Sequence, residues 1–422
     1  MGRRTKIIAA LGAVVAVVLL TLVLFPEPIE EGRCKLSRRK ADPDSQLIGL
    51  AYQYIKPLDD KPDRAQGVPD GFEQPRYYEI KSGDRPILMA ADFSRKQVRL
   101  CIDTDGDGIL SEERCFTARL SKETPVSGRR QRLGPISLVS GSGAAKTDGT
   151  FYVNCFREDA RGLLIPFPAF FRTGRLRLAG QTYRVAVVDG DRDGLFNSIL
   201  PLPLDRPWRS PACDVFAIDL NQNGTFEISL SQQSEVMPLG RLVKVADQYY
   251  AIDIAPDSRN LALSRTEPQL GTLVIESNDA DMELRLWSDA ADQHLSQGRQ
   301  WQLPAGEYNA IHAILTKADS SGDVWALSSN SFFTLTRLGR LEHFTIEPGK
   351  TTSIKIGPPL VVKADIGTAG SERVSISPVF VGCAGEEYTA ACRQGQQRPS
   401  PIPFKIVDEE GTVLIADNFT YT

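Results

Sequence analysis

The sequence predicts a mainly β fold, in which an N-terminal transmembrane helix is followed by a β domain with acidic loops and by one or two β-sandwich domains. Short apolar runs alternate with polar residues, glycine and proline are frequent (34 and 27 residues), and no amphipathic helical stretch of two clear turns is present. About 390 residues follow the N-terminal apolar run. They are enough for two to three domains, because single cores rarely exceed about 250 residues.

An uncharged apolar run extends from Ile7 to Phe25. It is long enough to cross a bilayer as a helix. Basic residues precede it and glutamates follow it, so the positive-inside rule places the bulk of the chain outside the cytoplasm. We therefore expect residues 1–26 to be a signal anchor that attaches the protein to a membrane. A cleaved signal peptide is the alternative, although the run is long for one and no A-x-A-like site follows it.

Residues 27–75 are expected to form a stalk and a loop. The segment from Arg33 to Ser45 is polar, the segment from Leu47 to Tyr52 is apolar, and the passage from Pro57 to Pro75 is rich in proline, aspartate and glycine.

Residues 76–266 are expected to form a β domain that carries three similar acidic loops. Each loop follows a short run of β-branched and aromatic residues that predicts a strand: Val98 to Ile102, Tyr183 to Val188 and Val215 to Ile218. The runs from Cys115 to Ala118 and from Phe226 to Leu230 predict strands after the first and third loops. The loops are Asp103-x-Asp105-x-Asp107-Gly108, Asp189-x-Asp191-x-Asp193-Gly194 and Asp219-x-Asn221-x-Asn223-Gly224.

This ladder of oxygen ligands indicates Ca²⁺. Oxygens at alternate positions of a tight loop can converge on one hard cation, and the glycine permits the turn. Ordinary Asp/Asn/Gly turns are the competing reading for any single loop, but the same strand, spacing and glycine occur three times. Because the flanking segments predict strands, a structural metal is favoured over a helix-moving sensor.

The loops resemble the first half of the EF-hand calcium loop and the related loops of secreted bacterial proteins. The resemblance ends at the twelfth position, where Arg114, Leu200 and Leu230 replace the bidentate glutamate. Each loop therefore needs a further ligand, for which Glu112 or Glu113 is the candidate in the first loop and Asn197 in the second. The expected ligands, with backbone carbonyls at Ile109, Leu195 and Thr225, are Asp103, Asp105, Asp107, Ile109, Glu113, Asp189, Asp191, Asp193, Leu195, Asp219, Asn221, Asn223, Thr225 and Glu227.

Cysteine usage agrees with export. The seven cysteines include no C-x-x-C pair and the chain has three histidines, so a zinc site is not expected. Disulfides are the default outside the cytosol. We expect Cys101 to pair with Cys115 around the first loop and Cys383 to pair with Cys392. By elimination Cys155 pairs with Cys213, which leaves Cys34 unpaired.

Regular alternation begins at about Gly271. Candidate strands from Thr272 to Glu276, from Met282 to Trp287 and from Gln300 to Tyr308 predict a β-sandwich over residues 270–357. The Leu303-Pro304-Ala305-Gly306-Glu307-Tyr308 turn resembles that of transthyretin-like and carboxypeptidase-regulatory sandwiches, and such modules are usually spacers or adhesive platforms. Residues 358–422 are expected to form a second sandwich-like segment that ends in a hairpin.

Neither charge nor motifs indicate catalysis or nucleic-acid binding. The net charge is −4, and neither G-x-S-x-G nor H-E-x-x-H occurs. We expect a calcium-binding, membrane-anchored, extracytoplasmic structural or adhesion protein whose partner is a surface protein or a polysaccharide. The alternative is a calcium-stabilised extracellular hydrolase of carbohydrate or peptide, with a carboxylate site near Asp103, Asp189 or Asp219. A calcium-responsive sensor is the third option.

Overall fold

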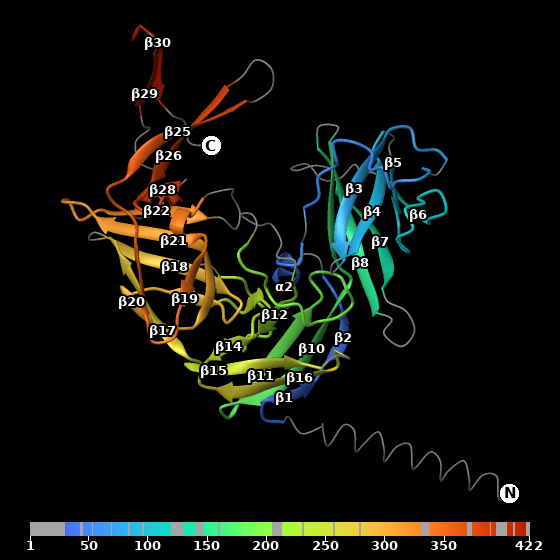
Figure 1. Cartoon of the computed structure of the whole chain (residues 1–422), viewed down its shortest axis with the longest axis horizontal. Coiled ribbons are helices and arrows are strands. Elements are labelled where there is room, and N and C mark those ends of the chain that lie inside the picture. The colour runs from blue at the N-terminus through green and yellow to red at the C-terminus, as the bar shows by residue number, and fades with distance from the viewer. Residues whose placement is uncertain are drawn as a thin grey trace, which may run out of the picture.

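The computed structural model describes residues 30–418 apart from short internal gaps, and it forms three packed sheet pairs and a C-terminal extension (Figure 1). The gaps are residues 43–44, 53, 69, 83–84, 95–96, 120–129, 141–146, 159–160, 205–212, 230–231, 256–257, 278–279, 331–336, 369–373, 389, 394–402 and 408–409.

The mainly β part of the predicted fold class is confirmed, but the part that predicted a transmembrane helix is wrong. Within the described ranges the helices are α2 (Gln46–Gly49) and the 3₁₀ turn η2 (Gly339–Leu341), and none is long and apolar enough to cross a membrane. A span needs about 20 apolar residues. The run from Ile7 to Phe25 lies outside the described residues. The architecture that the structure supports is therefore a β fold without a membrane-spanning helix among its described elements.

The first sheet pair contains the first acidic loop. Its two sheets have the strand orders β3-β4-β5-β6 and β7-β8-β9. Alternate residues of the strands face inward, so that Tyr78, Met89 and Leu100 pack against Phe151 and Val153. The strands are β3 (Pro75–Ser82), β4 (Arg85–Asp92), β5 (Gln97–Ile102), β6 (Cys115–Arg119), β7 (Arg130–Ser140), β8 (Thr147–Glu158) and β9 (Arg161–Pro168).

The second sheet pair contains the other two acidic loops. Its sheets have the orders β13-β12-β11-β10-β2 and β1-β16-β15-β14, and Val185 and Phe216 of one pack with Val243 and Leu263 of the other. The segment expected as a polar stalk supplies β1 and β2, which are polar because they are edge strands with exposed side chains. The strands are β1 (Arg33–Lys35), β2 (Ser37–Lys40), β10 (Phe170–Leu178), β11 (Gln181–Val188), β12 (Val215–Ile218), β13 (Val236–Pro238), β14 (Leu242–Val245), β15 (Gln248–Ile254) and β16 (Asn260–Thr266).

The third sheet pair agrees with the alternation expected from residue 270 onward. The sheet β20-β17-β24 packs on β19-β18-β21-β22-β28, with β23 beside β21, around a core that includes Leu273, Leu284 and Tyr308. The strands are β17 (Leu270–Glu276), β18 (Asp281–Ser288), β19 (Gln293–Leu295), β20 (Gln300–Pro304), β21 (Gly306–Ala318), β22 (Val324–Asn330), β23 (Phe344–Ile346), β24 (Thr351–Lys355) and β28 (Ala390–Arg393).

A shared core joins the second and third pairs. Leu47 and Ile48 of α2, Val188 and Val215 of the second pair, and Trp287 of the third belong to one buried cluster. Figure 1 shows α2 near the centre of the molecule, with the first and third pairs on opposite sides of it. Phe167 of β9 belongs to the same cluster, so the three pairs are joined by packing as well as by the chain.

Two small sheets complete the fold at its C-terminal end. The candidate strands expected at Val374 and at Pro378 are one strand, β26 (Val374–Val381), between β25 (Val361–Thr368) and β27 (Glu387–Tyr388). The predicted terminal hairpin consists of β29 (Pro403–Val407) and β30 (Val413–Asn418), which pair with each other in a two-stranded sheet.

Only the first of the expected disulfides is present in the described part of the chain. Cys101 and Cys115 are bridged, with their Cα atoms 4.4 Å apart. Cys155 and Cys213 are buried, unbridged and in different cores, so the pairing inferred by elimination is wrong. Cys383 is exposed and unbridged, so the predicted bridge to Cys392 is also absent.

Candidate metal centres

Each acidic loop begins where a buried strand ends. β5 leads into residues 103–108, β11 into residues 189–194 and β12 into residues 219–224. The first aspartate of each loop is at most 4% exposed. The strands predicted before the loops are thus confirmed, and they carry three carboxylates into the protein. No strand follows the third loop over residues 226–229, because Glu227 and Ser229 are held by Glu235 and Ser234 rather than by a sheet.

The three loops share one hydrogen-bond pattern. The first aspartate accepts the glycine N–H five residues later, over 3.2 Å from Gly108, 3.1 Å from Gly194 and 3.0 Å from Gly224. The side chains at the third and fifth positions each accept the N–H two residues later. One oxygen of each side chain is thereby fixed by the backbone. The glycines have φ values of 83° to 86°, a conformation that other residues rarely adopt.

A further carboxylate binds the backbone of each loop near its start. Glu113 accepts the N–H of Thr104 at 2.7 Å, Asp214 accepts that of Gly190 at 2.9 Å, and Glu235 accepts that of Asn221 at 2.9 Å. The contact is at the second position of the first and second loops and at the third position of the third loop, so these carboxylates are the candidates for the extra ligand that the sequence required. In the first two loops they belong to the groups that could hold a metal ion. Glu113 was expected, whereas Asp214 and Glu235 were not.

The first centre combines Asp103, Asp105 and Glu113, whose nearest ligand oxygens lie within 4.8 Å of one another. Gln66 pairs with this loop, since it donates to the carbonyl of Gly108 at 2.8 Å and accepts the N–H of Leu110 at 2.9 Å. The disulfide closes the loop from the other side. The loop is thus held in shape by contacts on both flanks.

The second centre is fully buried. Asp189, Asp191 and Asp214 lie within the same 4.8 Å limit, and Asp214 has no exposed surface. Burial, and then the charges of Asp191 and Asp193, raise the pKa of Asp189 well above its usual value. Burial and the charges of Asp189 and Asp191 do the same to the pKa of Asp214. The charge of the buried Arg192 lowers the pKa of Asp189 and so offsets part of the repulsion among the three carboxylates. With all three ionised the group still carries net negative charge, which a bound cation or protons would neutralise.

Glycine is required at the second centre because the backbone of the neighbouring strand approaches closely. A Cβ atom on Gly190 would lie 2.2 Å from the carbonyl oxygen of Cys213. This approach lets Asp214, the next residue, receive the N–H of Gly190. The loop and its further carboxylate are therefore positioned by the same contact.

Asp189 and Asp219 each have one buried oxygen, Oδ1, that makes no hydrogen bond to the described residues. A buried polar atom without a partner costs free energy, and buried charges are usually paired or bound to metal. Both oxygens belong to the first aspartate of a loop whose other oxygen is fixed by glycine. A cation in the loop would satisfy them.

The third centre has fewer charges. Asn221 and Asn223 are exposed, and Asp219 and Glu235 are the buried carboxylates of this loop. Burial raises the pKa of Glu235. The predicted ligand Glu227 instead accepts hydrogen bonds at 3.1 Å from the Asn223 amide and from the Thr225 hydroxyl.

The structure brings together some of the predicted ligands and not others. Asp107 and Asp193 lie outside the two carboxylate groups and accept the N–H of Ile109 and Leu195. Asp214 was missed because it lies before β12, where the sequence shows only an acid beside an apolar run. Comparison with protein-family models, with curated proteins and with solved structures finds no match to this chain.

Proposed function

We propose that the chain is a calcium-binding extracytoplasmic protein with a structural or adhesive role, in which Ca²⁺ holds the three loops. The observation that carries the proposal is the buried group Asp189, Asp191 and Asp214, which includes an oxygen without a partner. A cation would offset both the repulsion and the missing contact.

The ligand chemistry supports Ca²⁺ over other metals. Both carboxylate groups contain oxygen ligands alone, without histidine or cysteine. Zinc and copper sites favour nitrogen and sulfur, whereas calcium accepts six to eight oxygens in a flexible geometry. Mg²⁺ needs a stricter octahedral arrangement and retains water, which suits a fully buried acidic loop less well.

A structural role is supported by where the loops lie. They follow strands of packed sheets rather than a pair of helices, so metal binding fixes a connection and does not open a groove. The disulfide beside the first loop suggests an oxidising compartment. A surface protein or a polysaccharide is the partner that such a location offers. No feature among the described residues favours the hydrolase alternative.

Calcium titration by calorimetry of the metal-free full chain tests the proposal. The unaltered protein should bind up to three Ca²⁺ ions, and Asp105→Asn and Asp191→Asn should each remove or weaken one. Asp70→Asn, a change at an exposed aspartate outside the loops, is the matched control and should bind as the unaltered protein does. An absence of calcium binding at near-neutral pH would refute the proposal.

A further inference from the structure

A basic groove runs over one face of the sheet formed by β2, β10 and β11, beside the third acidic loop. Its volume is about 860 Å³. Among its described lining residues the one acid is Asp219, which is almost fully buried. The cations that line it are Lys35, Arg39, Lys40, Arg175 and Arg184.

The strand register concentrates these charges. Arg175 of β10 lies directly opposite Arg184 of β11. Thr173, two residues before Arg175, lies opposite Ser37 of β2. Because alternate residues of a strand share a face, Arg39 lies on the same face of the sheet as Arg175 and Arg184. Like charges directly opposite each other destabilise a sheet. An anion bound over the groove would remove this repulsion.

Three of the groove cations are available to a ligand. Arg39, Lys40 and Arg175 are exposed and make no ion pair within the described part of the chain. Arg184 is held in place, since it donates to the carbonyl of Gly224 at 2.6 Å and lies over the Phe226 ring at 4.8 Å. The Arg184 guanidinium is therefore fixed, and Arg39, Lys40 and Arg175 can adjust around it.

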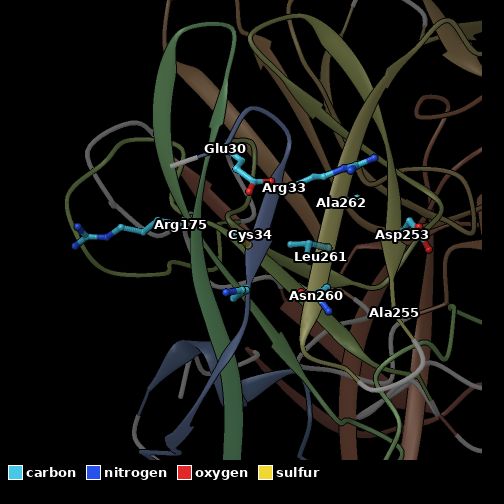
Figure 2. A pocket seen from close by; sticks show the side chains of 10 residues that line it. Glu30, Arg33, Cys34, Arg175, Asp253, Ala255, Asn260, Leu261 and Ala262 are labelled. Carbon is cyan, nitrogen blue, oxygen red and sulfur yellow. The ribbon is translucent and has the colours of Figure 1, made fainter. Parts of the chain in front are cut away.

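A neighbouring pocket of about 810 Å³ shares Lys35 and Arg175 with the groove, but it has mixed charge because Glu30 and Asp253 also line it. Figure 2 shows the Arg175 side chain extending away from Glu30 and from Arg33. The uncompensated positive charge thus belongs to the groove and not to this pocket.

We propose that the groove binds an acidic polysaccharide, a glycan chain that carries carboxylate or sulfate groups. Besides the cations, the hydroxyls of Ser37, Thr173 and Thr182 and the amide of Gln222 line the groove. Ser37 and Thr173 already donate to backbone carbonyls and the Gln222 amide donates to Gln181, so these three side chains offer a sugar hydroxyl mainly acceptor oxygens. The half-buried ring of Phe171 offers an apolar surface to a sugar face.

The observations favour a glycan over a membrane or a nucleic acid. Cations that line a concave groove are less accessible to a flat bilayer than to a single extended chain. A nucleic acid would find one aromatic residue, Phe171, for base stacking among the lining residues of the groove. The inference gives a ligand to the proposed binding role and rests on it, but the groove residues themselves do not need calcium to bind an anion.

Binding of polygalacturonate and dextran sulfate oligosaccharides to the full chain, measured by calorimetry at low and physiological salt, tests this inference. The Arg39→Ser/Arg175→Ser variant should lose at least about tenfold in affinity, because two charge-assisted contacts are removed, and its salt dependence should be shallower. Neutral dextran should not bind.

Arg33→Ser/Arg265→Ser is the matched control, since it removes the same charge outside the groove and should keep the affinity within about twofold. Equal losses in both variants, or no binding by the unaltered chain, would overturn the inference. Tighter binding to anionic vesicles than to the glycans would assign the groove to a membrane instead. Melting curves establish that the exposed substitutions leave the fold intact. Glycan binding measured in chelator tests the groove inference even if the chain does not bind calcium. Calcium binding without glycan binding would refute the groove inference and leave the calcium proposal standing.

Discussion

Asp214 is the residue that adds a third buried carboxylate to the second loop. Its two oxygens accept the N–H groups of Gly190 and Ser198 at 2.9 Å each, so that the carboxylate is held at the start of the loop without exposure to solvent. A cation bound at this position would be attracted to all three carboxylates and would offset their mutual repulsion. If the loop binds an ion, as proposed, the residue should affect metal affinity and stability together.

Asp214→Asn should uncouple stability from calcium at this loop. The variant removes one charge from the buried group but also replaces one of the two accepting oxygens by an NH₂ donor, so the diagnostic quantity is not the melting temperature of the metal-free protein but the rise on adding calcium, which should shrink. Each tenfold loss of affinity removes about 1.4 kcal/mol of calcium-dependent stabilisation at saturating metal. Thermal melts with chelator and with calcium measure it, and Asp253→Asn is the control. An undiminished calcium response would show that Asp214 is not a ligand.

Asp92 provides a prediction of pH dependence away from the loops. Burial alone would raise its pKa, but hydrogen bonds from Ser94 and from the N–H groups of Glu73 and Gln74 outweigh it and lower the pKa. A lowered folded-state pKa contributes stability above the usual aspartate pKa, and this contribution is lost as pH falls through the folded-state value.

Asp92→Asn should therefore destabilise the protein by about 1–3 kcal/mol at pH 7 and by less near pH 3. Urea unfolding at the two pH values measures the difference. A destabilisation that is equal at both values would contradict the assignment of charge to Asp92.

For single residues, the sequence predicts the candidate ligands that lie within one loop, but not those that other segments of the chain contribute. The Asp/Asn ladder and its glycine identify Asp103, Asp189 and Asp219 because their spacing is local. Asp214 and Glu235 reach their loops through pairing of β12 with β11 and with β13, and no local spacing encodes that distance.

The hairpin of β5 and β6 is the element on which the first centre depends. Cys101 lies opposite Cys115 in the strand register, and their bridge closes the ends of the loop that contains Asp103 and Glu113. The bridge and the metal ligands constrain the same short segment. Removing either the disulfide or the bound metal should therefore reduce the stabilisation that the other provides.

Cys101→Ser/Cys115→Ser should lower the free energy of unfolding by about 2–4 kcal/mol and weaken calcium binding at the first loop. Chemical denaturation and calcium titration of this variant measure the two effects. Cys383→Ser, at an exposed and unbridged cysteine, is the control. Unchanged stability together with unchanged calcium affinity would show that the bridge does not shape the loop.

Strand identity was predicted well in β5, β11 and β18, where short runs are rich in apolar residues. It failed where polarity reflects an edge position, as in β2, whose residues are all exposed. It also failed after the third loop, where Phe226 is buried by packing rather than by sheet pairing. In both cases the partner segment is distant in the sequence, so composition alone misled the prediction.

The whole molecule is a set of sheet pairs joined by buried contacts. The sequence predicted the mainly β class and the change of texture near Gly271, but it treated residues 76–266 as one β domain. The structure has two cores in that range, because β10, which follows β9 along the chain, pairs with β11 and β2 and not with a strand of the first pair. Core membership follows from long-range packing that sequence patterns do not specify.

Trp287→Ala should separate the unfolding of the third sheet pair from that of the second. Trp287 is 2% exposed and shares a core with Leu47 and Val215, so truncation should cost about 3–5 kcal/mol and reduce the coupling between the pairs. Calorimetry should show that the unfolding transitions of the second and third sheet pairs are further apart in temperature than in the unaltered protein. Trp301→Ala, within the third pair alone, is the control. Identical profiles for both variants would contradict a coupling role for the shared core.

The most direct test of the central claim is the melting temperature of the full chain, stripped with chelator and then titrated with Ca²⁺ and, separately, with Mg²⁺. We predict a saturable rise with Ca²⁺ that exceeds the rise with Mg²⁺ at equal concentration, and that is reduced in Asp191→Asn. No rise with Ca²⁺ would show that the three loops are acidic turns and not metal centres.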